Sequence, residues 1–293
     1  MHSFVGRLIA TLPIPFALAA GPVVHAEPPE IRWRPDRPVQ GSLVLLAVRP
    51  AGDDTTLLVT GTLAGEPLHF EADQYGAFVA MGAIPLDAAD SILLHVAVNG
   101  AHTVTLIPLA RRAIAREVLR AAPRFSSPPD STLAARVERE RLRVREVVVR
   151  ARATPRLWTA PFVPPRQSQI RSGFGFEREF SNTVTSRHLG VDFAGVQGAA
   201  AQAANRGVVV LVDDLFYGGR TIYVDHGAGL LTAYMHLSRA LVAAGDTVRR
   251  GQVIGRVGAT GRVTGPHLHW AARYGAILVD PLDLVNFDWT PFP

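Results

Sequence analysis

The chain has 293 residues, 48% hydrophobic and 19% charged, which is enough for two domains with buried cores and excludes a disordered chain. The absence of cysteine excludes disulfides, thiolate metal sites and cysteine nucleophiles, and the absence of lysine excludes Schiff-base chemistry on a lysine side chain. The net charge of +5 is uneven, because sixteen arginines but only six acidic residues fall between residues 111 and 178. Attraction to an anionic cell-wall or membrane surface and a solvated helical segment both fit this excess.

Residues 1–26 have the pattern of a secretory signal peptide. Arg7 precedes an apolar run from Leu8 to Ala20, and small residues end at Ala26, where a signal peptidase would cleave. The run is too short to span a bilayer comfortably, and no cysteine at the cleavage site could carry a lipid. We therefore expect an exported protein, periplasmic or associated with the cell wall, without a stable membrane anchor.

Residues 27–110 are predicted to form a small N-terminal β-sandwich. Apolar runs such as Leu43 to Val48 are separated by turn residues. Alternating apolar residues flank Asn99-Gly100, and both residues of this dipeptide tolerate the positive φ of a hairpin turn. Three histidines occur here at unrelated spacings and are interpreted as surface or packing residues: His69, His95 and His102.

Residues 111–160 are predicted to be an arginine-rich helical connector. A short helix is expected from Arg111 to Pro123. A longer helix is expected from Thr132 to Ala153, with Asp130 or Ser131 as its N-cap. No aromatic residues are interleaved with the arginines of this longer helix, so we do not expect it to bind nucleic acid.

Residues 161–290 change to strands punctuated by glycine, which predicts a compact all-β domain. His267 and His269 are two residues apart, so on a strand they would share one face. His188 and Asp192 are four apart and would lie about 13 Å from each other in a straight strand, too far for one ion. Gly190 offers a bend between them.

Two imidazoles and one carboxylate suffice for a catalytic zinc, which keeps its fourth position for water. A further histidine nearby could move a proton or stabilise an oxyanion. The chain has no His-Glu-x-x-His helix motif, so it does not fit the common helix-borne zinc peptidases. Spacing alone leaves open whether these histidines hold a metal or are structural.

Six motifs in the C-terminal region occur in an order that resembles the M23 family of zinc metallopeptidases, the lysostaphin and LytM-type peptidoglycan endopeptidases. They are Arg171-Ser-Gly-Phe-Gly175, Arg187-His-Leu-Gly-Val-Asp-Phe193, Tyr234-Met-His-Leu-Ser238, Gly245-Asp-Thr-Val-Arg-Arg-Gly-Gln-Val-Ile-Gly255, Gly258-Ala-Thr-Gly261 and Gly265-Pro-His-Leu-His269. The resemblance covers about residues 161 to 285. It implies a two-sheet β peptidase domain with a groove over one zinc ion, and a mainly β chain overall.

The resemblance also implies roles for individual residues. His188, Asp192 and His269 match the metal ligands of the family. His236 and His267 match its two catalytic histidines, and the resemblance does not decide which is the general base. His226 matches a structural position.

The substrate-binding residues are not assigned by any motif. We expect the groove to be lined by Phe174, Tyr234 and their neighbours.

The implied function is hydrolysis of peptide cross-links between peptidoglycan stem peptides, with a D,D-endopeptidase favoured over an enzyme that cleaves a Gly-Gly bridge. One alternative is a non-catalytic LytM-type factor that binds and activates another wall hydrolase. A biotinyl or lipoyl carrier, which residues 245–255 also resemble, is excluded because it needs a lysine. Residues 27–160 are a candidate autoinhibitory segment. The sequence does not predict the oligomeric state.

Overall fold

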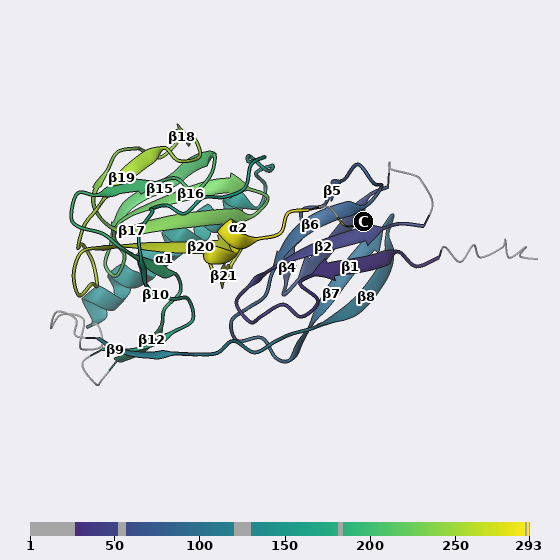
Figure 1. The fold of residues 1–293 in the computed structure, drawn as a ribbon, viewed down its shortest axis with the longest axis horizontal. Coiled ribbons are helices and arrows are strands. Elements are labelled where there is room, and N and C mark those ends of the chain that lie inside the picture. Colours follow the sequence, from purple (N-terminus) through teal and green to yellow (C-terminus); the bar gives the residue numbers. More distant parts are fainter. Residues whose placement is uncertain (1–26, 52–56, 120–129, 181–183, 291, 293) are drawn as a thin grey trace, which may run out of the picture.

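The computed structural model describes residues 27–51, 57–119, 130–180, 184–290 and 292 (Figure 1). The predicted signal peptide lies outside these residues. Within them, no helix combines the length and the apolar character needed to cross a membrane. The expectation of a mainly β chain is confirmed, because strands dominate on both sides of the connector (Figure 1).

The N-terminal part is a sandwich of two antiparallel sheets, with strand orders β1-β2-β6-β5 and β4-β3-β7-β8. Its strands are β1 (Glu30–Arg34), β2 (Leu43–Arg49), β3 (Val59–Leu63), β4 (Glu66–Pro67), β5 (Glu71–Ala72), β6 (Phe78–Ala83), β7 (Ser91–Val98) and β8 (Ala101–Pro108). The β7–β8 hairpin turns at Asn99 and Gly100, whose φ angles of 47° and 83° are those the turn requires.

Strand β2 is buried on both faces, which explains why its sequence is a continuous apolar run. Val44 and Leu46 point into the core between the two sheets. Leu45 and Ala47 point to the outer face, where Phe287, Trp289 and Phe292 cover them. A strand covered on one face only would instead alternate apolar and polar residues.

Outside residues 120–129, which are not described, the connector contains one strand and one helix, β9 (Arg116–Leu119) and α1 (Ser131–Ala151). The helix begins as expected, since the Asp130 side chain accepts a hydrogen bond from the Leu133 amide at 2.8 Å. The short helix predicted from residue 111 is wrong. Residues 111–115 are irregular, and β9 instead pairs in parallel with β11 of the C-terminal domain.

The C-terminal part is built on a large sheet with the main strand order β10-β13-β20-β17-β16-β15-β18, to which β14, β19 and β21 are added. Its elements are β10 (Ile170–Ser172), β13 (Val191–Ala194), β14 (Ala200–Gln202), β15 (Gly207–Leu215), β16 (Gly219–Gly227), β17 (Leu230–Ala240), β18 (Thr247–Val248), β19 (Val253–Val257), β20 (His267–Tyr274), β21 (Ile277–Val279) and α2 (Leu282–Asn286). A second sheet contains β9, β11 (Glu177–Phe180) and β12 (Val184–Arg187).

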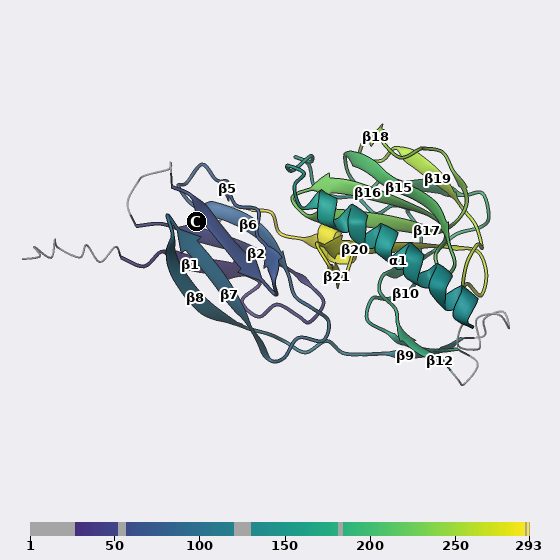
Figure 2. The ribbon, with the colours of Figure 1, turned by 180° about the vertical axis from the view of Figure 1, so that it is seen from behind.

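Helix α1 lies across the large sheet (Figure 2). Its buried residues Val147 and Ala151 pack on Leu231 of β17. Val144 packs against a neighbouring cluster that includes Ala271 of β20. Odd-numbered residues of β20 share one face of the sheet, so α1 covers the same face that carries His267 and His269.

Candidate metal centre and catalytic cleft

The three predicted metal ligands come together from two adjacent strands and the bend before them. Asp192 on β13 and His269 on β20 are direct partners in the antiparallel register. His188 precedes β13 and is held by its backbone, which donates to the Phe176 carbonyl at 2.8 Å and accepts from the Gly175 amide at 2.7 Å. All three side chains are buried.

Gly190 makes the bend between His188 and Asp192 possible. A Cβ atom at this position would lie 2.5 Å from His269 Nε2 and 2.6 Å from the Trp270 carbonyl oxygen. Both distances are shorter than any normal carbon contact. The bend that the spacing required is therefore present, and it needs a residue without a side chain.

The ligand atoms have the separations expected around one small cation. Asp192 Oδ1 lies 3.0 Å from His188 Nε2 and 2.8 Å from His269 Nδ1, and the two nitrogens are 3.0 Å apart. Tetrahedral zinc with bonds of about 2.0–2.1 Å would place its ligand atoms about 3.3 Å apart. His188 Nδ1 donates to the Gly173 carbonyl at 2.7 Å, so its Nε2 presents a lone pair to the carboxylate. His188 Nε2 and Asp192 Oδ1 are then both acceptors, and two acceptors 3.0 Å apart fit a cation bound between them.

Electrostatics favour the metal-binding protonation states of His269 and Asp192. Burial lowers the pKa of His269 to about 4, which favours the neutral imidazole. Burial alone would raise the pKa of Asp192, but its close contacts with the imidazoles of His188 and His269 lower it well below its usual range. A neutral imidazole and an ionised carboxylate are the forms that coordinate zinc. These three residues form the group that the described part of the chain offers for a metal ion.

His236 and His267 lie beside the ligands with their rings 4.9 Å apart. His236 Nδ1 donates to the Thr260 carbonyl at 2.9 Å, and His267 Nδ1 donates to the Gly265 carbonyl at 2.8 Å. Both rings therefore carry their proton on Nδ1 and leave Nε2 as an acceptor. Burial lowers the pKa of His236 well below its usual value. Each ring thus presents its Nε2 beside the metal ligands.

A backbone irregularity aims His236 into the site. Its φ of 63° is in the left-handed region, which a residue with a side chain rarely adopts. The pairing of β16 with β17 shifts by one residue here, as in a β-bulge. Strain of this kind often occurs at functional positions, where the surrounding structure holds it.

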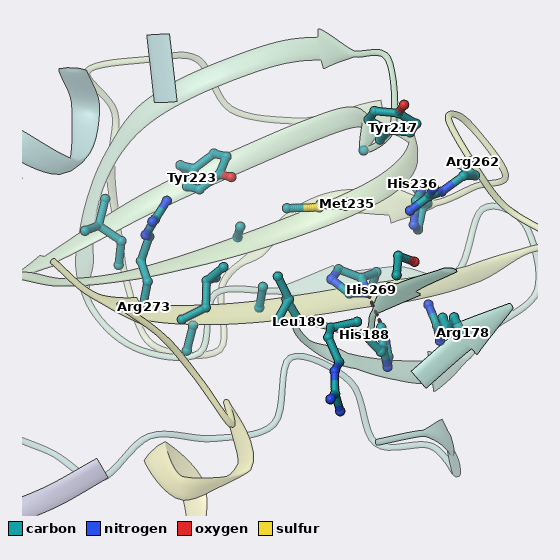
Figure 3. Close-up of a pocket in the computed structure, with 18 residues that line it drawn as sticks. Arg178, His188, Leu189, Tyr217, Tyr223, Met235, His236, Arg262, His269 and Arg273 are labelled. Carbon is teal, nitrogen blue, oxygen red and sulfur yellow. Dashed lines mark hydrogen bonds between the residues drawn. The ribbon is translucent and has the colours of Figure 1, made fainter. Parts of the chain in front are cut away.

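A cleft of about 260 Å³ runs along the sheet from His188, His236 and His269. Figure 3 shows His188, His236 and His269 toward one end with Arg262 and Tyr217, and Arg273 and Tyr223 toward the other. Met235 and Leu189 lie between the two groups. Four arginines line the cleft, namely Arg178, Arg187, Arg262 and Arg273.

The expectation that Phe174 and Tyr234 line the groove is wrong. Phe174 is 3% exposed and packs in the main core. Tyr234 is fully buried, and its hydroxyl accepts a hydrogen bond from the Ala204 amide at 2.8 Å. The aromatic residues on the cleft are Tyr217 and Tyr223. His226 lies outside the cleft, fully buried between the Arg206 carbonyl and Thr232.

Arg178 reaches the metal ligands from β11, and no sequence pattern marks it. Its guanidinium contacts Asp192 Oδ2, donates to Ser172 Oγ at 2.8 Å and donates to Glu117 Oε2 at 3.1 Å. Ser172 belongs to one of the recognised motifs. Arg178 is one of many arginines in its region, and Glu117 lies on a connector strand that sequence reasoning assigned to a helix.

Comparison with known proteins agrees with this geometry. The model of peptidase family M23 matches residues 186–281. The chain is 42% identical over 109 residues to peptidoglycan DD-endopeptidase ShyA of Vibrio cholerae serotype O1, covering 36% of this chain and 25% of that protein. It is 38% identical over 117 residues to DD-carboxypeptidase/endopeptidase Mpg of Neisseria meningitidis serogroup B, covering 40% of this chain and 27% of that protein. The match thus spans about a quarter of the length of these curated relatives.

A crystal structure of a candidate peptidase M23 from Pseudomonas aeruginosa superposes with a TM-score of 0.67 at 27% identity, covering 85% of this chain and 95% of that one. The likeness of fold therefore extends well beyond the segment that the family model matches. Together with the ordered motifs and the three converging ligands, it confirms the resemblance noted in the sequence: residues 186–281 of this chain are a domain of peptidase family M23.

Proposed function

We propose that the chain is an exported zinc metalloendopeptidase that hydrolyses peptide cross-links of bacterial peptidoglycan as a D,D-endopeptidase. The observation that carries the proposal is the convergence of His188, Asp192 and His269 on one point, with His236 and His267 beside it. Relatives named peptidoglycan DD-endopeptidases support the substrate class. Arginines along the cleft suit stem peptides, which carry free carboxylates.

The three ligands would hold the zinc ion. When bound, zinc would polarise the scissile carbonyl and lower the pKa of a water molecule at the site. His236 and His267 accept through Nε2, because their Nδ1 protons are engaged by carbonyl oxygens. One of them removes a proton from the attacking water, and the leaving amine takes up a proton from the same pair. Their fixed Nδ1 contacts hold the rings in one orientation through both transfers.

The test is release of muropeptides from purified sacculi of defined cross-link type, followed by mass spectrometry with and without a chelator. We expect cross-linked dimers to be lost, and the loss to be abolished by chelator and by His188→Ala. The matched control His102→Ala alters an exposed histidine of the N-terminal sandwich and should leave the rate unchanged. Zinc binding without any turnover would point instead to the non-catalytic LytM-type factor or to autoinhibition by residues 27–160.

A further inference from the structure

Glu117, Arg178 and Ser172 form a connected group behind the metal centre. Arg178 and Glu117 are direct partners in the parallel register of β9 and β11. The Ser172 hydroxyl donates to Glu117 Oε2 at 2.9 Å, and the same carboxylate oxygen accepts from Arg178 Nε at 3.1 Å. One oxygen atom of the connector strand thus receives both contacts.

Two branches run from this oxygen to two of the three metal ligands. Through Arg178, the first reaches Asp192 Oδ2. Through Ser172, the second reaches His188, whose Nδ1 lies 3.1 Å from the serine oxygen. Arg178 occupies Oδ2, so Oδ1 is the carboxylate oxygen that faces His188 and His269. The group therefore assigns one Asp192 oxygen to the arginine and the other to the metal.

Charge gives Glu117 a second role. The Arg178 side chain is 13% exposed and that of Asp192 is 8% exposed, so water screens the guanidinium poorly. A guanidinium that contacts a ligand carboxylate would repel a divalent metal ion bound to the same carboxylate. Glu117, whose side chain is 21% exposed, neutralises it. With Glu117 present the arginine orients Asp192 without adding net positive charge to the site.

We propose that Glu117 and Arg178 are positioning residues of the metal centre, and that the connector strand β9 thereby raises the affinity of the peptidase domain for zinc. Partners that orient metal ligands commonly change metal affinity about 10- to 100-fold when removed. Glu117 lies well before the segment that matches the family model, so this support comes from outside it. The proposal rests on the metal centre of the proposed function, but not on the bond that is cleaved.

The test is zinc affinity of the full chain, measured by competition with a chromophoric chelator. Glu117→Gln keeps the shape of the side chain and removes its charge, and we expect zinc affinity to fall about 10- to 100-fold. The control is Glu179→Gln, which breaks the ion pair of Glu179 with Arg116 across the same two strands without touching a ligand. We expect its affinity to stay within about 3-fold of the parent chain. Equal losses in the two variants would overturn the proposal.

A double-mutant cycle separates positioning from a general weakening of the fold. In an Arg178→Gln background there is no cation left to neutralise, so Glu117→Gln should then change zinc affinity by less than about 3-fold. An undiminished effect in that background would contradict the proposal. If Glu117→Gln does not fold, Ser172→Ala removes the contacts of the serine hydroxyl with Glu117, Arg178 and His188 but leaves the Arg178–Asp192 contact, and it should lower affinity by a smaller factor. Because the readout is zinc affinity, absence of hydrolysis would count against the proposed function alone.

Discussion

His226 lies inside the C-terminal sheet, where its Nδ1 donates to the Arg206 carbonyl and its Nε2 lies 2.8 Å from Thr232 Oγ1. Burial lowers its pKa from 6.5 to about 4. The ring is therefore neutral in the folded protein over a range of pH in which the unfolded chain protonates it. It serves stability, whereas His236 and His269 in the same sheet face the cleft.

This shift predicts acid destabilisation with a defined sign. Between pH 6.5 and 4 the unfolded chain binds a proton at His226 that the folded chain does not, so stability from this group is intact above pH 6.5 and lost as the pH falls. The loss should reach about 3 kcal/mol near pH 4. Denaturant unfolding of the metal-free chain from pH 4 to 8 gives the slope of the free energy of unfolding against pH, and this slope should be smaller in His226→Gln. It should persist in the exposed control His102→Gln, and an equal slope in both variants would contradict the assignment.

Tyr234 shows where residue-level prediction from sequence failed. In a regular strand, residues 234 and 236 lie on one face, which would have placed Tyr234 beside His236 in the groove. The irregular pairing at His236 adds one residue to β17 and reverses the alternation. Met235 and His236 both line the cleft, and Tyr234 enters the core. A bulge of this kind depends on the partner strand and leaves no local signal.

Helix α1 and strand β9 come from the same connector but contact different parts of the C-terminal domain. The helix follows from its own sequence, through its N-cap and the spacing of its apolar residues. The strand does not, because its partner β11 lies about sixty residues later and the pairing is set by tertiary structure. The ordered motifs predicted the five histidine and aspartate positions of the site, whereas Glu117 and Arg178 depended on this non-local pairing.

Helix α1 has one face packed on the large sheet and another exposed to solvent. Val147 is 3% exposed against Leu231, whereas Val149 on the same helix is 51% exposed. Val147→Asp places an unpaired charge in this contact and should lower the free energy of unfolding by about 3 kcal/mol. Val149→Asp is the matched control and should change it by less than about 0.5 kcal/mol. Denaturant titration of the two variants measures the difference.

Val147→Asp and Val149→Asp also test whether helix α1 restricts access to the cleft. Leu231 and Ala271 line the cleft and also pack in the clusters that α1 covers. If the helix restricts access, Val147→Asp should release muropeptides several-fold faster than Val149→Asp at a temperature where both are folded. An equal or lower rate would show that α1 does not act as an inhibitory segment.

At the scale of the whole molecule, partly buried polar contacts join the N-terminal sandwich to the C-terminal part of the chain. Glu66 of the sandwich accepts from Arg152 at 2.7 Å and from the Ala276 amide at 3.0 Å. Arg112 of the connector pairs with Asp280 at 3.0 Å. The Tyr274 hydroxyl donates to the Pro67 carbonyl at 2.8 Å. These contacts fix the sandwich against the peptidase domain.

Removing Glu66 should therefore destabilise the whole chain. Glu66→Ala leaves the Arg152 guanidinium and the Ala276 amide without this partner in a partly buried junction, at a cost of about 2 kcal/mol. The exposed pair of Asp90 and Arg111 supplies the control, since Asp90→Ala should leave the melting temperature unchanged. Calorimetry should show one transition for the parent chain. Two separate transitions would contradict a tightly joined pair of domains.

The covering of β2 by Phe287, Trp289 and Phe292 has a consequence for the order in which the chain can fold. Leu43 and Asp283, which are hydrogen-bonded at 2.9 Å, are 240 positions apart. A ribosome or an export channel that delivers the chain from its N-terminus exposes β2 long before the residues that cover it. The outer face of the sandwich is completed only after the segment with all five site residues has emerged. The sandwich is therefore synthesised first, but its outer face can be completed only after the residues of the peptidase domain have been delivered.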